Sequence, residues 1–198
     1  MRIGLFGGTF DPPHVGHLIL AEECRSQLQL DLLLWVLTEN PPHKQYAKVS
    51  PVEERVKLVE KAIHGNPAFL LSRVDIDRPG PHYAIDTMSL LQQEYPNSQL
   101  FYLMGGDSLH DLPSWLRPQD FLRVCDGIGV MRRHEDKVVL ESLEKVLPGI
   151  SKKVNIVEAP ILEISSSQIR QRIAEGMGYR YYLRDAVYQA ILELGLYK

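Results

Sequence analysis

Residues 7–17, which read GGTFDPPHVGH, constrain the fold more than any other stretch of the chain. They follow a short apolar run, Ile3–Phe6, and precede a segment with helical spacing of apolar residues, which predicts a strand, a tight turn and a helix start. The two opening glycines carry no Cβ, so a flat or anionic group can approach the main chain closely. His14 and His17 fall on one side of the first helical turn, beside unpaired amides and the positive end of the helix dipole. This segment is therefore a candidate site for phosphate oxygens.

A histidine-based anion site is favoured because neither of the two common phosphate-binding loops occurs. No G-x-G-x-x-G spacing follows the first strand, and no G-x-x-x-x-G-K-[ST] motif is found anywhere in the chain. The alternative is that the glycines form an ordinary α/β turn and that the histidines are structural.

Length, charge and cysteine usage narrow the class of protein. The 198 residues suffice for one α/β domain with a sizeable core and are too few for two. A formal net charge of −3 argues against a general binder of nucleic acid or membrane surfaces, so any anion binding is local. Cys24 and Cys125 are far apart and lack the spacing of a disulfide framework or a zinc site, which favours two buried small hydrophobes. No signal-peptide or membrane-spanning pattern is found, so a cytoplasmic location is expected, and a homo-oligomer is compatible with the sequence.

Apolar runs of strand length alternate with amphipathic segments along the chain. The clearest run, Leu32–Leu37, is continuous apolar sequence, which is typical of a parallel strand covered on both faces. Further strands are expected at residues 69–74, 100–104, 127–131 and 154–157, and helices at 52–63, 137–146 and 183–194. The predicted fold class is α/β, with a doubly wound, mostly parallel sheet in a single domain, residues 1–198. The C-terminal helical segment, residues 165–198, is expected to pack on that domain.

The loop at residues 38–49 follows the second strand, where ligands of open α/β sheets bind. Its Lys44 is a candidate for a substrate phosphate, and the alternative is a solvated loop. Next, Ser50–Glu53 predicts a capping box with proline at the first helical position. The Glu and Arg residues of that helix are expected on its solvated face.

Two further loops carry candidate ligand contacts. Amides near Tyr83 and Ala84 open a helix and suit a small carboxylate, whereas Thr87 is either a contact or a core residue. Gly105 ends a strand, and the Asp107 that follows fits a ribose or a metal as well as an ordinary turn. Trp115 either stacks on a flat heteroaromatic ring or is a half-buried core indole.

The stretch Ile164–Arg170, ISSSQIR, is the second strong signal. Ser165 and Gln168 predict an N-cap with its capping-box partner. Hydroxyls and the Arg170 guanidinium then share one face above free amides, which suits the phosphates of a nucleotide. An ordinary cap with a surface arginine is the alternative.

These segments together resemble one family. His14-Val15-Gly16-His17 is similar to the signature of the HxGH nucleotidyltransferases, and Ile-Ser-Ser-Ser-x-Ile-Arg resembles their second signature. The residues around the first motif, Pro-Pro-His-Lys at 41–44 and the Gly-x-Asp element resemble, more narrowly, the bacterial nicotinate mononucleotide adenylyltransferases. The chain departs from that pattern at His82 and Ala84, where the family has serine and threonine.

The resemblance implies a Rossmann-like nucleotidyltransferase fold and transfer of AMP from ATP to nicotinate mononucleotide, with Mg²⁺ held mainly by the ATP phosphates. The residues that it implies as catalytic are His14, His17 and Arg170. Those implied for ATP are Gly7, Gly8, Thr9, Phe10, Gly105, Asp107, Ser165, Ser166, Ser167 and Ile169. Those implied for nicotinate mononucleotide are Asp11, Lys44, Tyr83, Ala84, Thr87 and Trp115.

Several alternatives to this function stay open at the level of sequence. Nicotinamide mononucleotide and phosphopantetheine adenylyltransferases share HxGH, and only the region of Tyr83, Ala84 and Trp115 favours nicotinate. A nucleotide-binding module without turnover is disfavoured by the intact histidines and Arg170, and a dinucleotide-dependent oxidoreductase by its missing glycine fingerprint.

Overall fold

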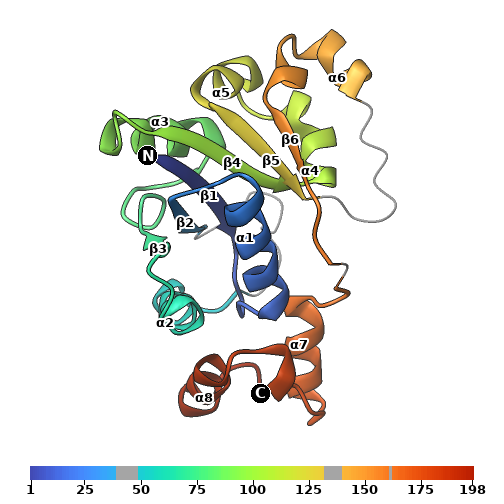
Figure 1. Cartoon of the computed structure of the whole chain (residues 1–198). Coiled ribbons are helices and arrows are strands. Elements are labelled where there is room, and N and C mark those ends of the chain that lie inside the picture. Colours follow the sequence, from blue (N-terminus) through green and yellow to red (C-terminus); the bar gives the residue numbers. More distant parts are fainter. Residues whose placement is uncertain (39–48, 132–139, 161) are drawn as a thin grey trace.

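The computed structural model describes residues 1–38, 49–131, 140–160 and 162–198 (Figure 1). Its strands are β1 (Arg2–Gly8), β2 (Leu32–Leu37), β3 (Phe69–Ser72), β4 (Gln99–Gly105), β5 (Gly127–Met131) and β6 (Val154–Val157). Its α-helices are α1 (Val15–Gln27), α2 (Val52–Ile63), α3 (Ala84–Glu94), α4 (Gly106–Asp111), α5 (Pro118–Val124), α6 (Leu140–Val146), α7 (Ser166–Ala174) and α8 (Asp185–Leu194). Short 3₁₀ turns lie at Leu112–Ser114, Ile150–Lys152 and Arg180–Tyr182.

The described strands form one six-stranded sheet in the order β3-β2-β1-β4-β5-β6, and every pair is parallel. The chain winds outward from β1 in one direction through β3 and then returns to wind outward through β4 to β6. The strand order therefore reverses between β1 and β4, which is the arrangement of a doubly wound α/β fold. The predicted fold class is confirmed.

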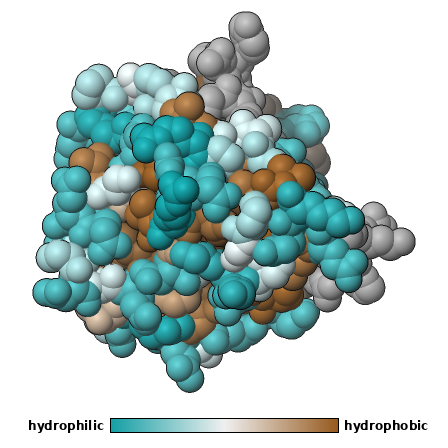
Figure 2. All heavy atoms as spheres, turned by 90° about the horizontal axis from the view of Figure 1, so that it is seen from above, coloured by the Kyte–Doolittle hydropathy of each residue, from teal (hydrophilic) through white to brown (hydrophobic). Residues whose placement is uncertain are grey.

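Apolar side chains of the strands alternate between two cores, one on each face of the sheet. Leu33, Trp35 and Leu37 of β2 face the first core, which is completed by α1, α2, α7 and α8. Leu34 and Val36 face the second core, which is completed by α3 to α6. This double burial explains why β2 reads as unbroken apolar sequence. Hydrophilic residues surround the apolar ones on the face seen in Figure 2.

The two helices α7 and α8 lie at the bottom of Figure 1, beside the N-terminal end of α1. Ile169 of α7 and Val187 of α8 are buried in the first core, so the C-terminal segment packs on the α1 and α2 side of the sheet. Among the described residues, no helix is both long and apolar enough to span a membrane.

Some local expectations were wrong. Strand β3 ends at Ser72 rather than Val74, and α4 and α5 were not expected because each spans only two turns. Pro51, not Ser50, is the N-cap of α2, and no side chain caps that helix. Arg55 of α2 is 1% exposed and not on a solvated face.

The cysteines behave as expected from their isolation in the sequence. Cys24 and Cys125 are both buried and free. Burial raises the pKa of Cys24 to about 12, so its thiol stays protonated and acts as a small apolar side chain.

The register of β4 and β5 places Phe101 opposite Gly127. The Phe101 ring covers the glycine and carries the Arg2 guanidinium 4.4 Å above its centroid. A Cβ on Gly127 would lie 2.5 Å from two atoms of this buried ring. Glycine is therefore required here by close packing.

We predict that Gly127→Ala destabilises the fold by about 1–3 kcal/mol, because the ring must leave its rotamer or the strands must separate. The measurement is urea unfolding followed by circular dichroism. Gly178→Ala is the matched control, because a Cβ there meets nothing within 4 Å. Equal unfolding midpoints for the two variants would contradict the packing argument.

Candidate active site

A cavity of about 260 Å³ lies where the carboxyl ends of β1 and β4 diverge. Ligands of doubly wound folds bind at this reversal of strand order, because the loops leaving the two strands turn to opposite faces of the sheet. The residues that line the cavity come from β1, β4, the α4 region and the end of β5: Phe6, Gly7, Tyr102, Leu103, Met104, Gly105, Ser108, Asp111, Trp115 and Met131.

His14 and His17 form a stacked pair at the start of α1. His14 is the N-cap in extended conformation, and the two ring centroids are 3.7 Å apart at an interplanar angle of 26°. The His14 N–H donates to Nδ1 of His17 over 3.2 Å. Because Nδ1 accepts this bond, the proton of a neutral His17 ring must lie on Nε2. The fold thereby sets the tautomer of the neutral His17 ring.

His14 is the more deeply buried of the two rings, with 6% of its surface exposed. Burial lowers its pKa to about 4, so the ring is neutral at physiological pH. Its Nδ1 has no hydrogen-bond partner among the described residues. This neutral ring lies beside the unpaired amides of a helix N-terminus, which is a setting that suits an anion.

The loop between β1 and α1 is held by donors from distant parts of the chain. The carbonyl of Thr9 accepts from Arg55 Nη1 over 3.0 Å. The carbonyl of Asp11 accepts from Arg170 Nη1 over 2.7 Å. The next carbonyl, that of Pro12, accepts from the Ser166 hydroxyl over 2.8 Å. Helices α2 and α7 therefore anchor the loop that carries the histidines.

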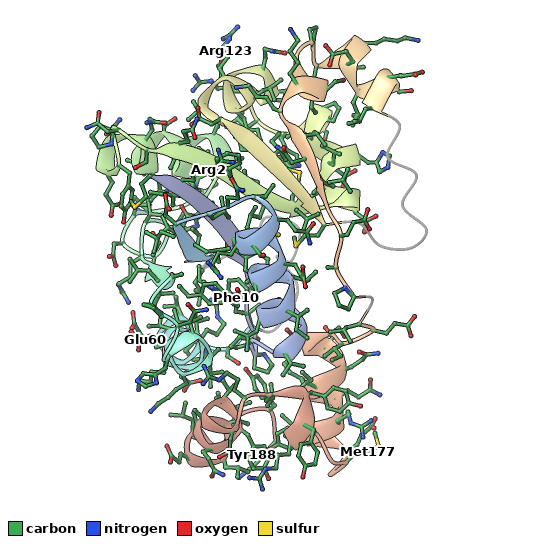
Figure 3. All side chains as sticks on the ribbon, in the orientation of Figure 1. Arg2, Phe10, Glu60, Arg123, Met177 and Tyr188 are labelled. Carbon is green, nitrogen blue, oxygen red and sulfur yellow. The ribbon has the colours of Figure 1, made fainter. Side chains whose placement is uncertain are left out.

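Phe10 explains why position 8 is a glycine. The residue has a φ of 48°, in the left-handed region, and its ring is buried in the first core. A Cβ on Gly8 would lie 2.7 Å from that ring. Gly8 therefore gives room to Phe10, whose labelled side chain lies in the middle of the molecule in Figure 3. Gly7 has no such neighbour and lines the cavity.

Helix α7 begins as predicted, with a capping box between Ser165 and Gln168. The Gln168 N–H donates to the Ser165 hydroxyl over 3.2 Å, and the Ser165 N–H donates to Gln168 Oε1 over 3.0 Å. Arg170 also donates through Nη2 to the Ser167 hydroxyl over 3.3 Å. The structure thus brings the second signature against the first, while Ile169 is fully buried and serves the core.

Asp11 occupies a buried position behind the histidine loop. Its Oδ1 accepts from the Tyr197 hydroxyl over 2.6 Å, and its Oδ2 accepts from the Ser50 N–H over 3.1 Å. With 3% of its surface exposed and both oxygens bonded within the protein, its carboxylate is engaged in holding the loop. The predicted contact to nicotinate mononucleotide is therefore not supported by its side-chain geometry.

The start of α3 shows which of the predicted contacts are open to a ligand. Tyr83 is an extended N-cap, 37% exposed, and no side chain caps this helix. Thr87 is buried, and its hydroxyl donates to Asp75 Oδ1 over 2.7 Å and accepts from Arg78 over 3.2 Å. Thr87 is therefore a core residue. The backbone amides of Ala84 and Ile85, in the first turn of α3, remain available to a ligand.

Trp115 is a core indole that also borders the cavity, and its stacking on a ligand ring stays a prediction. Its ring packs edge to face on Tyr102 and Phe121, at centroid distances of 5.9 and 5.5 Å, and it also lines the cavity. Gly105 is the N-cap of α4, and Asp107 lies exposed in the first turn of that helix. A base or pyridine ring in the cavity would have Trp115 as one wall.

One candidate, Lys44, lies outside the described residues. Sequence reasoning also missed three residues, namely Arg55, Tyr102 and Tyr197. Arg55 and Tyr197 act across long stretches of chain, so no local spacing marks them. Tyr102 was detectable as the only polar side chain of an otherwise apolar strand end.

Known proteins of one class share this architecture. A family model described as cytidylyltransferase-like matches residues 5–172. Among solved structures, the Plasmodium falciparum nicotinic acid mononucleotide adenylyltransferase complexed with NaAD superposes with a TM-score of 0.79 at 19% identity, covering 99% of this chain and 97% of that one. Fold and site thus define a nucleotidyltransferase of the cytidylyltransferase-like class.

Two relatives of higher identity narrow the family. A protein of Thermomicrobium roseum named "Probable nicotinate-nucleotide adenylyltransferase" is 41% identical over 197 residues, which are 100% of this chain and 92% of that protein. The nicotinate-nucleotide adenylyltransferase of Bacillus subtilis is 37% identical over 201 residues, covering 100% of this chain and 98% of its own. The chain belongs to the nicotinate-nucleotide adenylyltransferase family, as the sequence resemblance predicted.

The burial of His14 leads to a pH prediction. Its pKa in the folded protein, about 4, lies below the value near 6.5 expected in the unfolded chain. Below pH 6.5 the His14 ring is protonated in the unfolded chain but stays neutral in the folded protein. The contribution of this group to the free energy of unfolding is therefore complete above pH 6.5 and decreases as the pH falls toward 4. An NMR titration of the ring protons should give a midpoint near 4, and His14→Asn should flatten this part of the stability curve by about 3 kcal/mol. A midpoint near 6.5 would contradict the prediction.

Proposed function

We propose that the protein transfers AMP from ATP to nicotinate mononucleotide, giving nicotinate adenine dinucleotide and pyrophosphate. The observation that carries the proposal is the stacked histidine pair at the N-terminus of α1, close to the reversal of strand order. Its family membership supports the same reaction. The reaction places the enzyme in NAD biosynthesis, with two small molecules as its substrates and the cytoplasm as its proposed location.

The chemistry needs positioning and charge stabilisation. A phosphate oxygen of nicotinate mononucleotide attacks the α-phosphorus of ATP and forms the new P–O bond, while the bond to the bridging oxygen breaks. Pyrophosphate leaves with that electron pair. Because the attacking phosphate is already ionised, the reaction needs no general base, and holding the two nucleotides in line is worth about 7–11 kcal/mol.

The proposed roles follow from the donors that lie at the N-terminal ends of α1 and α7. His17 Nε2–H and the buried ring of His14 contact the ATP phosphates as charge develops on the leaving oxygen. Arg170 keeps donors beyond the two it uses on Asp11 and Ser167, and these suit the pyrophosphate. Main-chain groups complete the proposed ATP site: Gly7, Gly8, Thr9, Phe10, Gly105, Ser165, Ser166, Ser167 and Ile169. The Asp107 side chain is proposed for the ribose.

Mg²⁺ enters this proposal as part of the substrate MgATP. Among residues 1–38, 49–131, 140–160 and 162–198, no three His, Cys, Asp or Glu side chains gather as a set of metal ligands. The triphosphate itself offers the oxygen ligands that Mg²⁺ prefers, so the protein's task is to bind the remaining oxygens.

Nicotinate is the proposed acceptor because the start of α3 offers amides without a fixed cation. Arg78, the nearby guanidinium, is paired with Asp75 over 2.9 Å and is only partly exposed. The amides at Tyr83 and Ala84 therefore carry the recognition of the carboxylate, and Trp115 is the proposed wall for the pyridine ring.

We expect His17→Ala to lower kcat for adenylyl transfer by about 10²–10³-fold, because it removes one preorganised donor to the developing charge. The measurement is pyrophosphate release with MgATP and nicotinate mononucleotide. His64→Ala is the control, because His64 is exposed at the far end of α2 and should leave kcat unchanged. Equal kcat values for the two variants would refute the role of His17.

The same assay tests the acceptor. Nicotinate mononucleotide should be used with a kcat/KM at least about 10²-fold above that of nicotinamide mononucleotide, because the neutral amide cannot replace a carboxylate at a helix N-terminus. Phosphopantetheine should give no pyrophosphate. Comparable kcat/KM values for the two pyridine nucleotides would refute the carboxylate site. They would not contradict the proposed adenylyl transfer.

A further inference from the structure

The C-terminal end of the chain reaches the histidine loop. Helix α8 ends at Leu194, and its C-cap Gly195 has a left-handed φ of 64°. The Leu196 N–H then bonds back to the Ile191 carbonyl over 3.2 Å. This turn directs Tyr197 toward the α1 side of the molecule. Its hydroxyl donates to Asp11 Oδ1 over 2.6 Å, across 186 residues of sequence.

The acceptor of this bond is part of the loop. Asp11 lies three residues before His14, and its own carbonyl is held by Arg170. Its second carboxylate oxygen holds the Ser50 N–H, and the Ser50 carbonyl in turn accepts from Arg55 Nε over 2.9 Å. A continuous chain of hydrogen bonds therefore joins the C-terminal tail, the histidine loop and the start of α2.

We propose that Tyr197 is a positioning residue for adenylyl transfer, which acts through Asp11 to hold residues 9–14 in the geometry that aligns His14 and His17. The inference rests on the proposed function. Tyr197 touches no reacting atom: its effect reaches the substrate through the backbone of the loop. The C-terminal tail is thereby part of the active-site scaffold.

The bond is strong because its charged acceptor is buried and its donor is partly buried. Asp11 is 3% exposed, and burial together with the Asp11 charge raises the pKa of Tyr197 far above its ordinary value, so the hydroxyl remains a donor throughout the physiological pH range. Removal of the hydroxyl leaves one buried carboxylate oxygen without its partner. The loop then gains freedom next to the histidines, and not in the sheet, whose strands pair independently of it.

The first test compares Tyr197→Phe with Tyr181→Phe, a matched control whose ring is 93% exposed in the same C-terminal segment. In the pyrophosphate assay we expect kcat to fall about tenfold in Tyr197→Phe, with KM for ATP within about twofold, because a small misalignment affects the transition state more than binding. Tyr181→Phe should match the wild type. A Tyr197→Phe enzyme with kcat within about twofold of the wild type would overturn the proposal.

Amide hydrogen exchange tests the positioning without relying on turnover. In Tyr197→Phe the amides of residues 9–11 and 14 should exchange about tenfold faster than in the wild type, with the β1 and β4 amides unchanged. Equal rates in the loop would overturn the proposal, as would uniformly faster exchange, which indicates a loss of global stability only. A wild-type enzyme without turnover on nicotinate mononucleotide would instead refute the proposed function.

A double-mutant cycle asks whether Tyr197 acts through Asp11. The loss of kcat caused by Tyr197→Phe should shrink to about twofold or less in an Asp11→Ala background, because the acceptor of the hydroxyl is already removed. Independent losses that multiply in the double variant would show that Tyr197 acts by another route and would overturn the proposal.

Discussion

The backbone carbonyls between β1 and α1 lie beyond the sheet ladder and before the helix, so secondary structure cannot satisfy them. A buried carbonyl without a donor is costly, and this requirement organises the carboxyl edge of the sheet. Thr9, Asp11 and Pro12 each find a donor from a remote helix. Satisfying one short loop therefore fixes where α2 and α7 sit.

This constraint explains how an anion site can work without a P-loop lysine. The loop holds His14 as an extended N-cap, and the bond from its N–H fixes the tautomer of His17. The buried His14 ring is neutral, so at the start of α1 oriented donors and the helix dipole take the place of a charged side chain. Such preorganised groups stabilise developing charge with little rearrangement during the reaction.

Local signals in the sequence predicted the parts of the site that form within a few residues. The Ser165–Gln168 capping box and the facing histidines depend on helical spacing alone, and both follow the pattern. Arg55 and Tyr197 make their contacts to the loop across 46 and 186 residues of sequence. No pattern in the neighbouring residues therefore indicates that they anchor it. The expected cap at Ser50 failed for the same reason, because its N–H is bound by the distant Asp11 carboxylate.

The anchoring bonds also decide how the second signature can meet a phosphate. A serine hydroxyl has one proton, and Ser166 uses it on the Pro12 carbonyl. Its proposed contact with ATP would then come from its main-chain N–H, which the first position of α7 leaves without a helical partner. Arg170 has five N–H donors and can hold the loop and a phosphate together. The Ser166 hydroxyl therefore anchors the histidine loop, whereas the Arg170 guanidinium can hold that loop and also bind a phosphate of the substrate.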